Sequence, residues 1–254
     1  MHIETVGAGA DLVLIHGWAM HAGIFAPLTE RLARKFRVHL VDLPGHGYSR
    51  DDLAHLAPEH SATALASRLP RAIWVGWSLG GLVALHAALL PQSPLRGLVV
   101  IASSPRFVAG ADWSLGVKPE VFEQFDAGLR SNYRATIERF LALEALGSEQ
   151  TQACLHELRA HVFERGEPAL AALEWGLHEL ETTDLRAHLE QLAAPSLLLA
   201  GRRDRLVPAA AMRWAAQQSP QGRFVEFSSG HAPFIGHAGE VAAAITAFAQ
   251  ELSP

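Results

Sequence analysis

The sequence has little of what defines several other classes of protein. Its single cysteine, Cys154, excludes an internal disulfide and a cysteine-built zinc or iron–sulfur site. No apolar run approaches the roughly 18 residues that span a bilayer, and the run from Leu12 to Ile15 is too short for a signal-peptide core. No block of five like charges occurs, so a nucleic-acid-binding surface is not expected. We expect a cytoplasmic protein that binds neither nucleic acid nor membrane.

What the chain does contain is enough apolar residues for a large core. Apolar residues make up 49% of the sequence and charged residues 19%, and the formal net charge is −5. These values are typical of a globular protein and exclude global disorder. The length of 254 residues admits one large domain, or a core domain that carries an insertion. We expect the chain to act as a monomer.

Short apolar runs alternate with segments of helical period up to Ser104, which predicts successive β–α–β units. The predicted strands cover residues 12–16, 37–41, 72–77 and 97–101, and the predicted helices cover residues 24–34 and 79–89. The run Leu98-Val99-Val100-Ile101 is apolar throughout, as expected for a strand that is buried on both faces of a parallel sheet.

The alternation stops after Ser104 and resumes at Ser196. The intervening segment has no strand-like run and shows helical patterns instead. Helices are predicted for residues 136–146, 150–163, 209–218 and 239–250, and strands for residues 196–200 and 223–227. We therefore predict an α/β fold with a mostly parallel central sheet flanked by helices. The core would comprise residues 1–106 and 184–254, and residues 107–183 would form a helical cap inserted after the turn Ser103-Ser104-Pro105.

A glycine-flanked serine follows the predicted strand 72–77, in the sequence Gly76-Trp77-Ser78-Leu79-Gly80. Gly-x-Ser-x-Gly between a strand and a helix is typical of a nucleophile elbow. The turn strains the serine backbone. The positions two residues before and two residues after the serine must be nearly free of side chains to avoid clashes, and Gly76 and Gly80 satisfy this. The alternative is a chance match in a glycine-containing turn. The strand before the motif and the helix after it favour Ser78 as a nucleophile.

Two further residues complete the pattern of a catalytic triad. A serine hydroxyl becomes nucleophilic when a general base, held by a third group, takes its proton. Asp204 follows the predicted strand 196–200, and His231 follows the predicted strand 223–227. Taken alone, Asp204 is equally well read as a surface carboxylate, and His231 is one of 14 histidines. The chain order Ser78, Asp204, His231, with each residue at a strand end, predicts a triad.

A hydrolase of this type also needs two backbone N–H groups that bind the oxyanion. Leu79, next to the serine, is expected to supply one, and Trp18 in His16-Gly17-Trp18 the other. Simple core packing is the alternative for Trp18. The loss of one such donor typically lowers turnover by about 10²–10³.

These motifs resemble those of the α/β-hydrolase superfamily and, within it, the pimeloyl-[acyl-carrier protein] methyl ester esterases of biotin synthesis. The matching stretches include residues 14–18, 41–49, 76–84, 102–107, 116–119, 138–143 and 231–235. The resemblance implies the triad Ser78, Asp204 and His231 and the oxyanion donors Trp18 and Leu79. It also implies that the cap contributes an acyl-binding wall, made by Phe140, Leu141, Ala142, Leu143 and Glu144.

The resemblance further implies a serine carboxylesterase that removes the methyl ester from pimeloyl-acyl-carrier protein and also cleaves short-chain esters. The partner would be the acyl-carrier protein, and neither a cofactor nor a metal is expected. In the family, basic cap residues meet the acidic carrier. Here residues 107–184 hold 6 basic and 14 acidic residues, a net charge of −8. Arg130, Arg134 and Arg139 form a basic patch only if no helix break at Ser131-Asn132 separates them.

Three alternatives remain open at this point, because a fold does not fix a reaction. The first is a general short-chain carboxylesterase. The second is a carbon–carbon bond hydrolase or lyase on the same scaffold. The third is a ligand receptor that keeps a vestigial triad.

Overall fold

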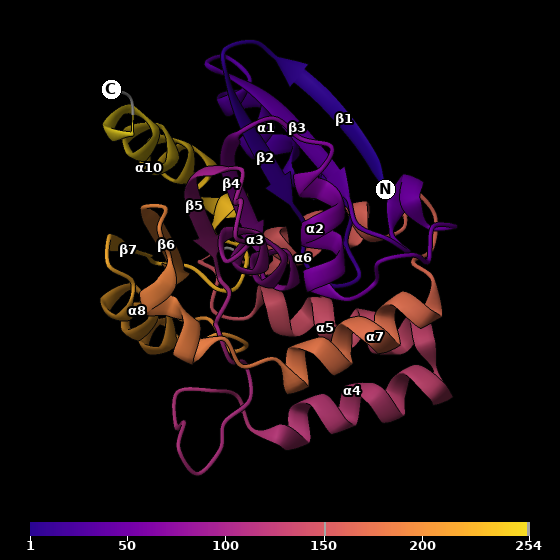
Figure 1. The fold of residues 1–254 in the computed structure, drawn as a ribbon. Helices are drawn as coiled ribbons and strands as arrows, with labels where there is room; N and C mark the ends of the chain where they lie inside the picture. The colour runs from indigo at the N-terminus through magenta and orange to yellow at the C-terminus, as the bar shows by residue number, and fades with distance from the viewer. Residues whose placement is uncertain (150, 253–254) are drawn as a thin grey trace.

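The computed structural model describes residues 1–149 and 151–252. Within these residues the chain forms a seven-stranded sheet of order β1-β3-β2-β4-β5-β6-β7 (Figure 1). The strands are β1 His2–Gly7, β2 Ala10–Ile15, β3 Phe36–Asp42, β4 Ala72–Trp77, β5 Leu95–Ile101, β6 Ser196–Gly201 and β7 Gly222–Phe227. Only β1 pairs antiparallel, with β3; the other neighbours are parallel. The mostly parallel sheet predicted from the sequence is confirmed.

The central strands have a clear apolar sequence pattern, whereas the edge strand β1 does not. Every residue of β4 is buried, as expected for an apolar run with helices on both sides of the sheet. The residues of β1 are mostly exposed at the sheet edge, and its polar and apolar residues follow no strict alternation. This mixed and exposed composition explains why the sequence pattern did not reveal β1.

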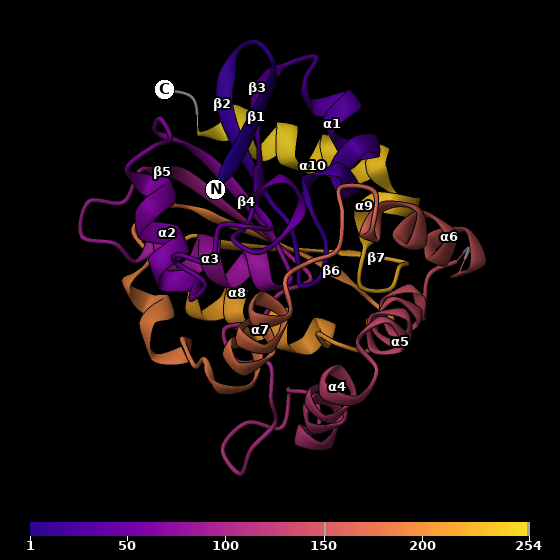
Figure 2. The ribbon, with the colours of Figure 1, turned by 90° about the vertical axis from the view of Figure 1, so that its right-hand side faces the viewer.

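Helices cover both faces of the sheet. Helices α1 (Ala26–Leu32) and α10 (Ala238–Glu251) pack together on one face. Figure 2 shows the other face covered by α2 (Pro58–Ala66), α3 (Leu79–Ala88) and α8 (Ala209–Gln218). The helix predicted for residues 24–34 is divided, because a 3-10 turn, Ala22–Phe25, precedes α1. Pro27 lies in the first turn of α1, where its missing N–H costs no helix hydrogen bond.

Four further helices lie between β5 and β6, and the described part of this segment adds no strand to the sheet. They are α4 Pro119–Ser131, α5 Tyr133–Ala145, α6 Thr151–Val162 and α7 Leu170–Thr182. Figures 1 and 2 show α4 farthest from the sheet, with α5 and α7 between it and the core. The break at Ser131-Asn132 is present, and the Asn132 side chain caps α5 by accepting from the Ala135 N–H at 3.1 Å. Gln150, where one predicted helix begins, lies outside the described residues.

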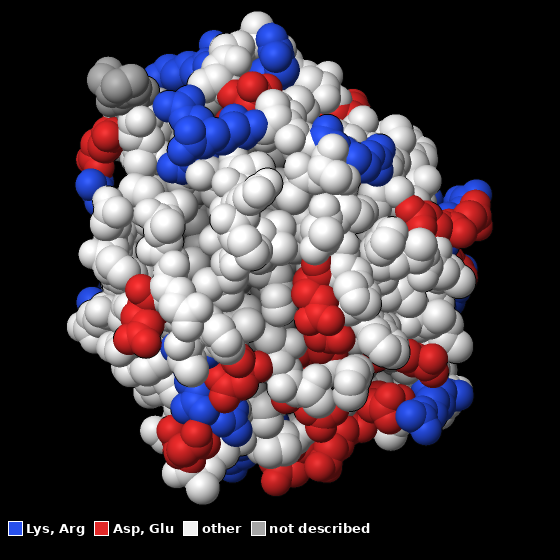
Figure 3. All heavy atoms as spheres, in the orientation of Figure 1, with Lys and Arg blue, Asp and Glu red and all other residues white. Residues whose placement is uncertain are grey.

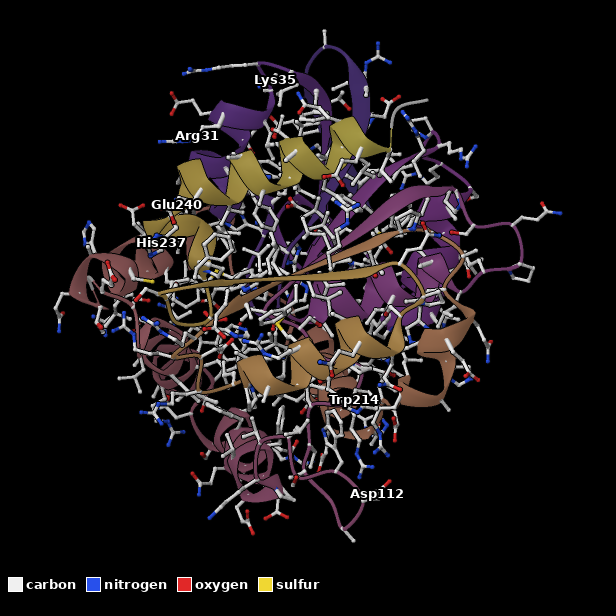
Figure 4. All side chains as sticks on the ribbon, turned by 90° about the vertical axis from the view of Figure 1, so that its left-hand side faces the viewer. Arg31, Lys35, Asp112, Trp214, His237 and Glu240 are labelled. Atoms are coloured by element: carbon white, nitrogen blue, oxygen red, sulfur yellow. The ribbon has the colours of Figure 1, made fainter. Side chains whose placement is uncertain are left out.

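The inserted helices are tied to the core at several points. The Trp18 indole N–H donates to the Leu173 carbonyl of α7 at 2.9 Å. Trp113, in the loop before α4, packs edge-on against Trp214 of α8, with ring centroids 4.9 Å apart. Figure 4 shows Trp214 directed from α8 toward the loop that bears Asp112. Because Trp18 follows the carboxyl end of β2, the insertion lies over that end of the sheet.

Residues 1–149 and 151–252 contain neither a membrane-spanning helix nor a cluster of metal-ligating side chains. None of the helices there is both long and apolar enough to cross a membrane. No three of the histidine, cysteine and acidic side chains there are grouped so that they could hold a metal ion.

Candidate active site

Ser78 lies in the sharp turn between β4 and α3. Its backbone has φ 53° and ψ −119°, a left-handed conformation that costs a non-glycine residue roughly 1–3 kcal/mol. The Ser78 N–H donates to the Ile101 carbonyl at the end of β5 at 3.0 Å, and the Gly81 N–H donates to the Ser78 carbonyl at 2.8 Å. These bonds hold the strained turn in place. An observed strained backbone of this kind points to function.

The two glycines of the motif are required by close backbone packing. A Cβ atom on Gly76 would overlap the Gly80 carbonyl. A Cβ atom on Gly80 would overlap the carbonyl oxygen of Ile15. The requirement for small residues, predicted from the motif, therefore has a direct steric cause. It also shows that the helix after Ser78 rests on the end of β2.

Asp204 and His231 are brought together from the loops that follow β6 and β7. His231 Nδ1 lies 2.8 Å from Asp204 Oδ2, and both side chains are buried. The other carboxylate oxygen, Oδ1, accepts the N–H groups of Leu206 at 2.8 Å and Val207 at 3.0 Å. Because a carboxylate only accepts, Nδ1 carries the imidazole proton and Nε2 has a free lone pair.

The imidazole lies against the residue that precedes the serine. The Trp77 and His231 rings are 5.7 Å apart, and the Trp77 indole N–H donates to the His231 carbonyl at 2.9 Å. His231 Nε2 is buried and has no hydrogen-bond partner among the described residues. His231 therefore contacts the residue that precedes Ser78, and the Ser78 hydroxyl is not hydrogen-bonded to Nε2 in this structure.

The two predicted oxyanion donors both adjoin Ser78. Leu79 is the first residue of α3, where a helix N–H has no intrahelical acceptor. Trp18 follows Gly17, and a Cβ atom on Gly17 would lie 3.1 Å from the Ser78 Cβ. Across the residues that the structure describes, neither the Trp18 nor the Leu79 N–H donates to a protein acceptor. Two buried amides beside the serine are thus left for a ligand.

A buried polar cluster holds the loop that bears Trp18. His16 Nδ1 donates to the Gly17 carbonyl at 2.8 Å, and His16 Nε2 accepts the Leu43 N–H at 2.9 Å. The Asp42 carboxylate accepts the N–H groups of Ala22 at 2.8 Å and Tyr48 at 2.9 Å. No local sequence pattern reveals this cluster, because its members come from separate strands and loops.

Arg165, in the loop between α6 and α7, reaches into the same cluster. It pairs with Asp42 at 3.2 Å, and its guanidinium stacks 4.6 Å from the Tyr48 ring centroid. The inserted segment therefore supports the loop that bears Trp18 through a nearly buried ion pair between Arg165 and Asp42.

The histidines of this cluster are held neutral. Burial, together with the neighbouring His46, lowers the pKa of His16 to about 3. Burial likewise lowers the pKa of His46 to about 4. Burial alone would raise the pKa of Asp42, but the N–H groups of Ala22 and Tyr48 and the charge of Arg165 outweigh it, so this pKa lies below its usual range.

The predicted acyl-binding residues of α5 differ in how deeply they are buried. Phe140 and Leu141 are buried, and the Phe140 ring meets Trp18 edge-on at 4.6 Å. Glu144 is buried on the same side. Ala142 and Leu143 are half-buried, and Leu143 packs at the edge of the same hydrophobic core. Of the five residues, Phe140 is thus in direct contact with the proposed oxyanion loop.

The site is closed in this structure. Ser78 is 2% exposed and His231 is 1% exposed. Helix α7 covers the loop beyond them, since a Cβ atom on Gly176 would lie 2.7 Å from the Trp18 ring and 3.2 Å from Leu79. Ser78 and His231 are therefore almost inaccessible to solvent in this structure.

The fold and this site define a class of protein. The family described as alpha/beta hydrolase fold matches residues 12–238. An esterase from Exiguobacterium antarcticum superposes with a TM-score of 0.86 at 18% identity, covering 98% of this chain and 95% of that one. A thermophilic esterase from Thermogutta terrifontis gives a TM-score of 0.84 at 24% identity, covering 100% and 94%. The protein is an α/β hydrolase.

Curated relatives of similar length narrow this class. A protein from Xanthomonas campestris pv. campestris (strain B100), named pimeloyl-[acyl-carrier protein] methyl ester esterase, is 54% identical over 253 residues, covering 99% of this chain and 100% of its own. A protein of the same name from Stenotrophomonas maltophilia (strain R551-3) is 54% identical over 256 residues, covering 100% and 98%. The chain belongs to the family of pimeloyl-[acyl-carrier protein] methyl ester esterases.

Proposed function

We propose that this protein is a serine carboxylesterase that hydrolyses the methyl ester of pimeloyl-acyl-carrier protein, with Ser78, His231 and Asp204 as its catalytic triad. The observation that carries the chemistry is the buried Asp204–His231 pair, 2.8 Å apart, beside a strained serine. The relatives' shared name supports the substrate. A substrate held on a soluble carrier supports a cytoplasmic enzyme, and we propose that it acts as a monomer.

The first half-reaction forms an acyl-enzyme and releases methanol. His231 Nε2 takes the Ser78 proton as the oxygen attacks the ester carbonyl, and Asp204 holds the imidazole in the required tautomer. The missing Ser78–His231 hydrogen bond forms by rotation of the serine side chain, since such bonds are often long before substrate binds. The N–H groups of Trp18 and Leu79 stabilise the oxyanion. The imidazolium then gives its proton to the departing methoxide.

The second half-reaction repeats these steps with water. His231 takes a proton from water, which attacks the acyl-enzyme carbonyl, and then returns a proton to Ser78 Oγ as the carboxylic acid leaves. The products are pimeloyl-acyl-carrier protein with a free carboxylic acid, which loses its proton to solvent, and regenerated enzyme. No other protein residue needs to gain or lose a proton.

Residues 107–183 act in this proposal as a cap that forms the acyl site. Phe140 contacts Trp18, and Phe125 of α4 packs against Phe140 with ring centroids 5.3 Å apart. Leu141, Ala142, Leu143 and Glu144 continue the same helix. An apolar wall of this kind suits the methylene chain of a pimeloyl group.

The charge distribution bears on how the carrier protein approaches. In Figure 3, acidic side chains gather over the part of the molecule that contains α4 and α7. Arg130 of α4 pairs with Asp126 at 3.1 Å, Arg134 of α5 pairs with Glu167, and the helix break lies between them. We therefore propose that the acidic carrier does not dock on the outer face of α4 and α7.

The experiment that tests the proposal follows loss of the methyl group from pimeloyl-carrier-protein methyl ester by mass spectrometry. Ser78→Ala should lower kcat by about 10⁴–10⁶, as expected for removal of a triad nucleophile. Ser67→Ala, a change at a serine on the distant end of α2, is the matched control and should leave kcat unchanged.

Two results would contradict the proposal in different ways. Near-wild-type turnover by a folded Ser78→Ala variant would remove the triad. If the wild type hydrolysed small aryl esters but left the carrier-bound ester intact, the substrate assignment would fall and a general carboxylesterase would remain.

A further inference from the structure

The last turn of α5 is wedged between the two loops that bear Asp204 and His231. The His231 N–H donates to the Glu144 carbonyl at 3.2 Å. A Cβ atom on Gly230 would overlap the Leu146 carbonyl and lie 3.1 Å from the Glu144 carbonyl. A Cβ atom on Gly147, whose φ is +85°, would overlap the carbonyl of Arg203, the neighbour of Asp204. The end of α5 and the residues after it therefore meet His231 and the neighbour of Asp204 through the main chain.

The Glu144 side chain in this wedge has nothing to neutralise it. It is fully buried, and neither Oε1 nor Oε2 has a hydrogen-bond partner within the part of the chain that the structure describes. A carboxylate buried without a donor or cation costs several kcal/mol, so such a group keeps its proton. Burial raises the pKa of Glu144 well above its usual range, and the charge of Asp204 raises it further.

The titratable groups around Glu144 agree with a neutral acid. Asp204 is the charged neighbour from the loop after β6, and His231 comes from the loop after β7. From α6 comes Cys154, whose thiol pKa burial raises to about 11. The nearby cation, Arg203, is directed elsewhere, since it donates to Ser228 at 2.9 Å and pairs with Glu149 at 3.6 Å.

We propose that Glu144 is a positioning residue of the Asp204–His231 pair: its main-chain carbonyl fixes the His231 backbone, and its side chain must stay uncharged for His231 to act as the base. This inference rests on the proposed triad. An ionised Glu144 would place a second negative charge beside Asp204 and favour the protonated imidazole. A protonated imidazole cannot accept the Ser78 proton, so ionisation of Glu144 would shift the onset of activity to higher pH.

The first test compares pH profiles of kcat/KM on a short aryl ester for wild type and Glu144→Gln, from about pH 5 to about pH 10. The amide has nearly the shape of the acid but never ionises. The ratio of variant to wild-type kcat/KM should be constant while Glu144 stays neutral and should change with pH over the range in which Glu144 ionises. Glu138→Gln on the same helix, a half-exposed glutamate paired with Arg159, is the matched control and should give a ratio independent of pH.

The second test measures thermal unfolding of the same proteins and does not depend on catalysis. Unfolded Glu144 ionises near its ordinary pKa, about 4.3, whereas the folded group does not. Stability from the neutral acid is therefore fully present below that pH and is lost as pH rises toward the folded pKa. The Tm of Glu144→Gln relative to wild type should grow steadily over this range. Glu144→Met, which is also uncharged, should show the same trend if the amide variant does not fold.

A Tm difference that stays constant with pH would overturn the neutral acid. A pH-independent ratio of kcat/KM would overturn its link to catalysis. Either result would leave the effect of Ser78→Ala untouched, so failure of this inference is distinguishable from failure of the proposed function.

Discussion

The two regions on either side of Ser78 each contain a buried carboxyl group, but only one of the two groups has hydrogen-bond partners among the described residues. In the first, the oxyanion flank (residues 16–18, Asp42, His46 and Arg165), Asp42 is satisfied by two N–H groups and an arginine. In the second, the acid–base flank (Glu144, Asp204 and His231), the Glu144 carboxyl has no partner among the described residues. The oxyanion flank must stay rigid, and paired charges hold it. In the proposed mechanism the acid–base flank must move a proton, and an extra fixed charge there would interfere.

The two flanks therefore respond to pH in opposite directions. In the oxyanion flank, the lowered histidine pKa values give stability that is fully present above about pH 6.5 and is lost as pH falls toward the folded pKa values. In the acid–base flank, the raised pKa of Glu144 makes stability fall as pH rises. Because two histidines oppose one glutamate, stability from these groups should rise with pH up to about pH 6.5 and fall above it.

Among these predictions, removal of the Asp42 side chain should have the largest effect on the stability of the oxyanion flank. Asp42→Ala leaves two backbone N–H groups and Arg165 without their buried acceptor, so the free energy of unfolding should fall by about 3–5 kcal/mol. Urea denaturation measures this change. Asp51→Ala is the control, because Asp51 is almost fully exposed and its removal should change stability little. A loss below about 1 kcal/mol for Asp42→Ala would mean that the buried ion pair does not hold this flank.

A second prediction concerns Gly147, where the main chain after α5 packs against the main chain next to Asp204. Gly147→Ala places a Cβ atom against the Arg203 carbonyl at a positive φ, so it should cost about 1–3 kcal/mol and lower kcat by shifting Asp204. Gly236→Ala is the matched control, since no atom lies within 4 Å of the added Cβ. Chemical denaturation and kcat on an aryl ester report both effects. Equal behaviour of the two variants would show that α5 does not constrain the pair.

A smaller effect is expected from His46→Asn, which should remove part of the loss of stability of the oxyanion flank at low pH. His46→Asn keeps a donor for the Pro44 carbonyl, which His46 Nδ1 approaches to 2.9 Å, but it does not titrate. At about pH 5.5, one unit below the ordinary histidine pKa, the wild type should have lost about 1.4 kcal/mol that the variant retains relative to neutral pH. Denaturant unfolding at several pH values measures this difference. Parallel pH curves for both proteins would contradict a neutral buried His46.

Much of the architecture was predictable because it depends on local pattern. The buried strand 72–77 and the glycines around Ser78 are readable from a short window, and Asp204 and His231 follow from their order after predicted strands. Edge strand β1 and the division of helix 24–34 at Pro27 were missed, since an exposed strand and a proline near a helix start give weak signals.

The surroundings of the site residues were harder to predict, because they depend on contacts between distant segments. No local pattern connects Asp42 with Arg165. Glu144 did have a signal: Ile137, Phe140, Leu141 and Glu144 follow the spacing of one helix face, and the first three are apolar. That spacing predicts a buried carboxyl, but only the structure reveals that Asp204 is its neighbour.

The central claim is that the Asp204–His231 pair activates Ser78, and covalent labelling with a fluorophosphonate tests it most directly. The reagent should add one phosphonyl group per chain, located on Ser78 by tandem mass spectrometry. Labelling should be lost in Ser78→Ala and slowed by several orders of magnitude in His231→Ala, which lacks the base. Labelling of another residue, or an unchanged rate in His231→Ala, would contradict the account.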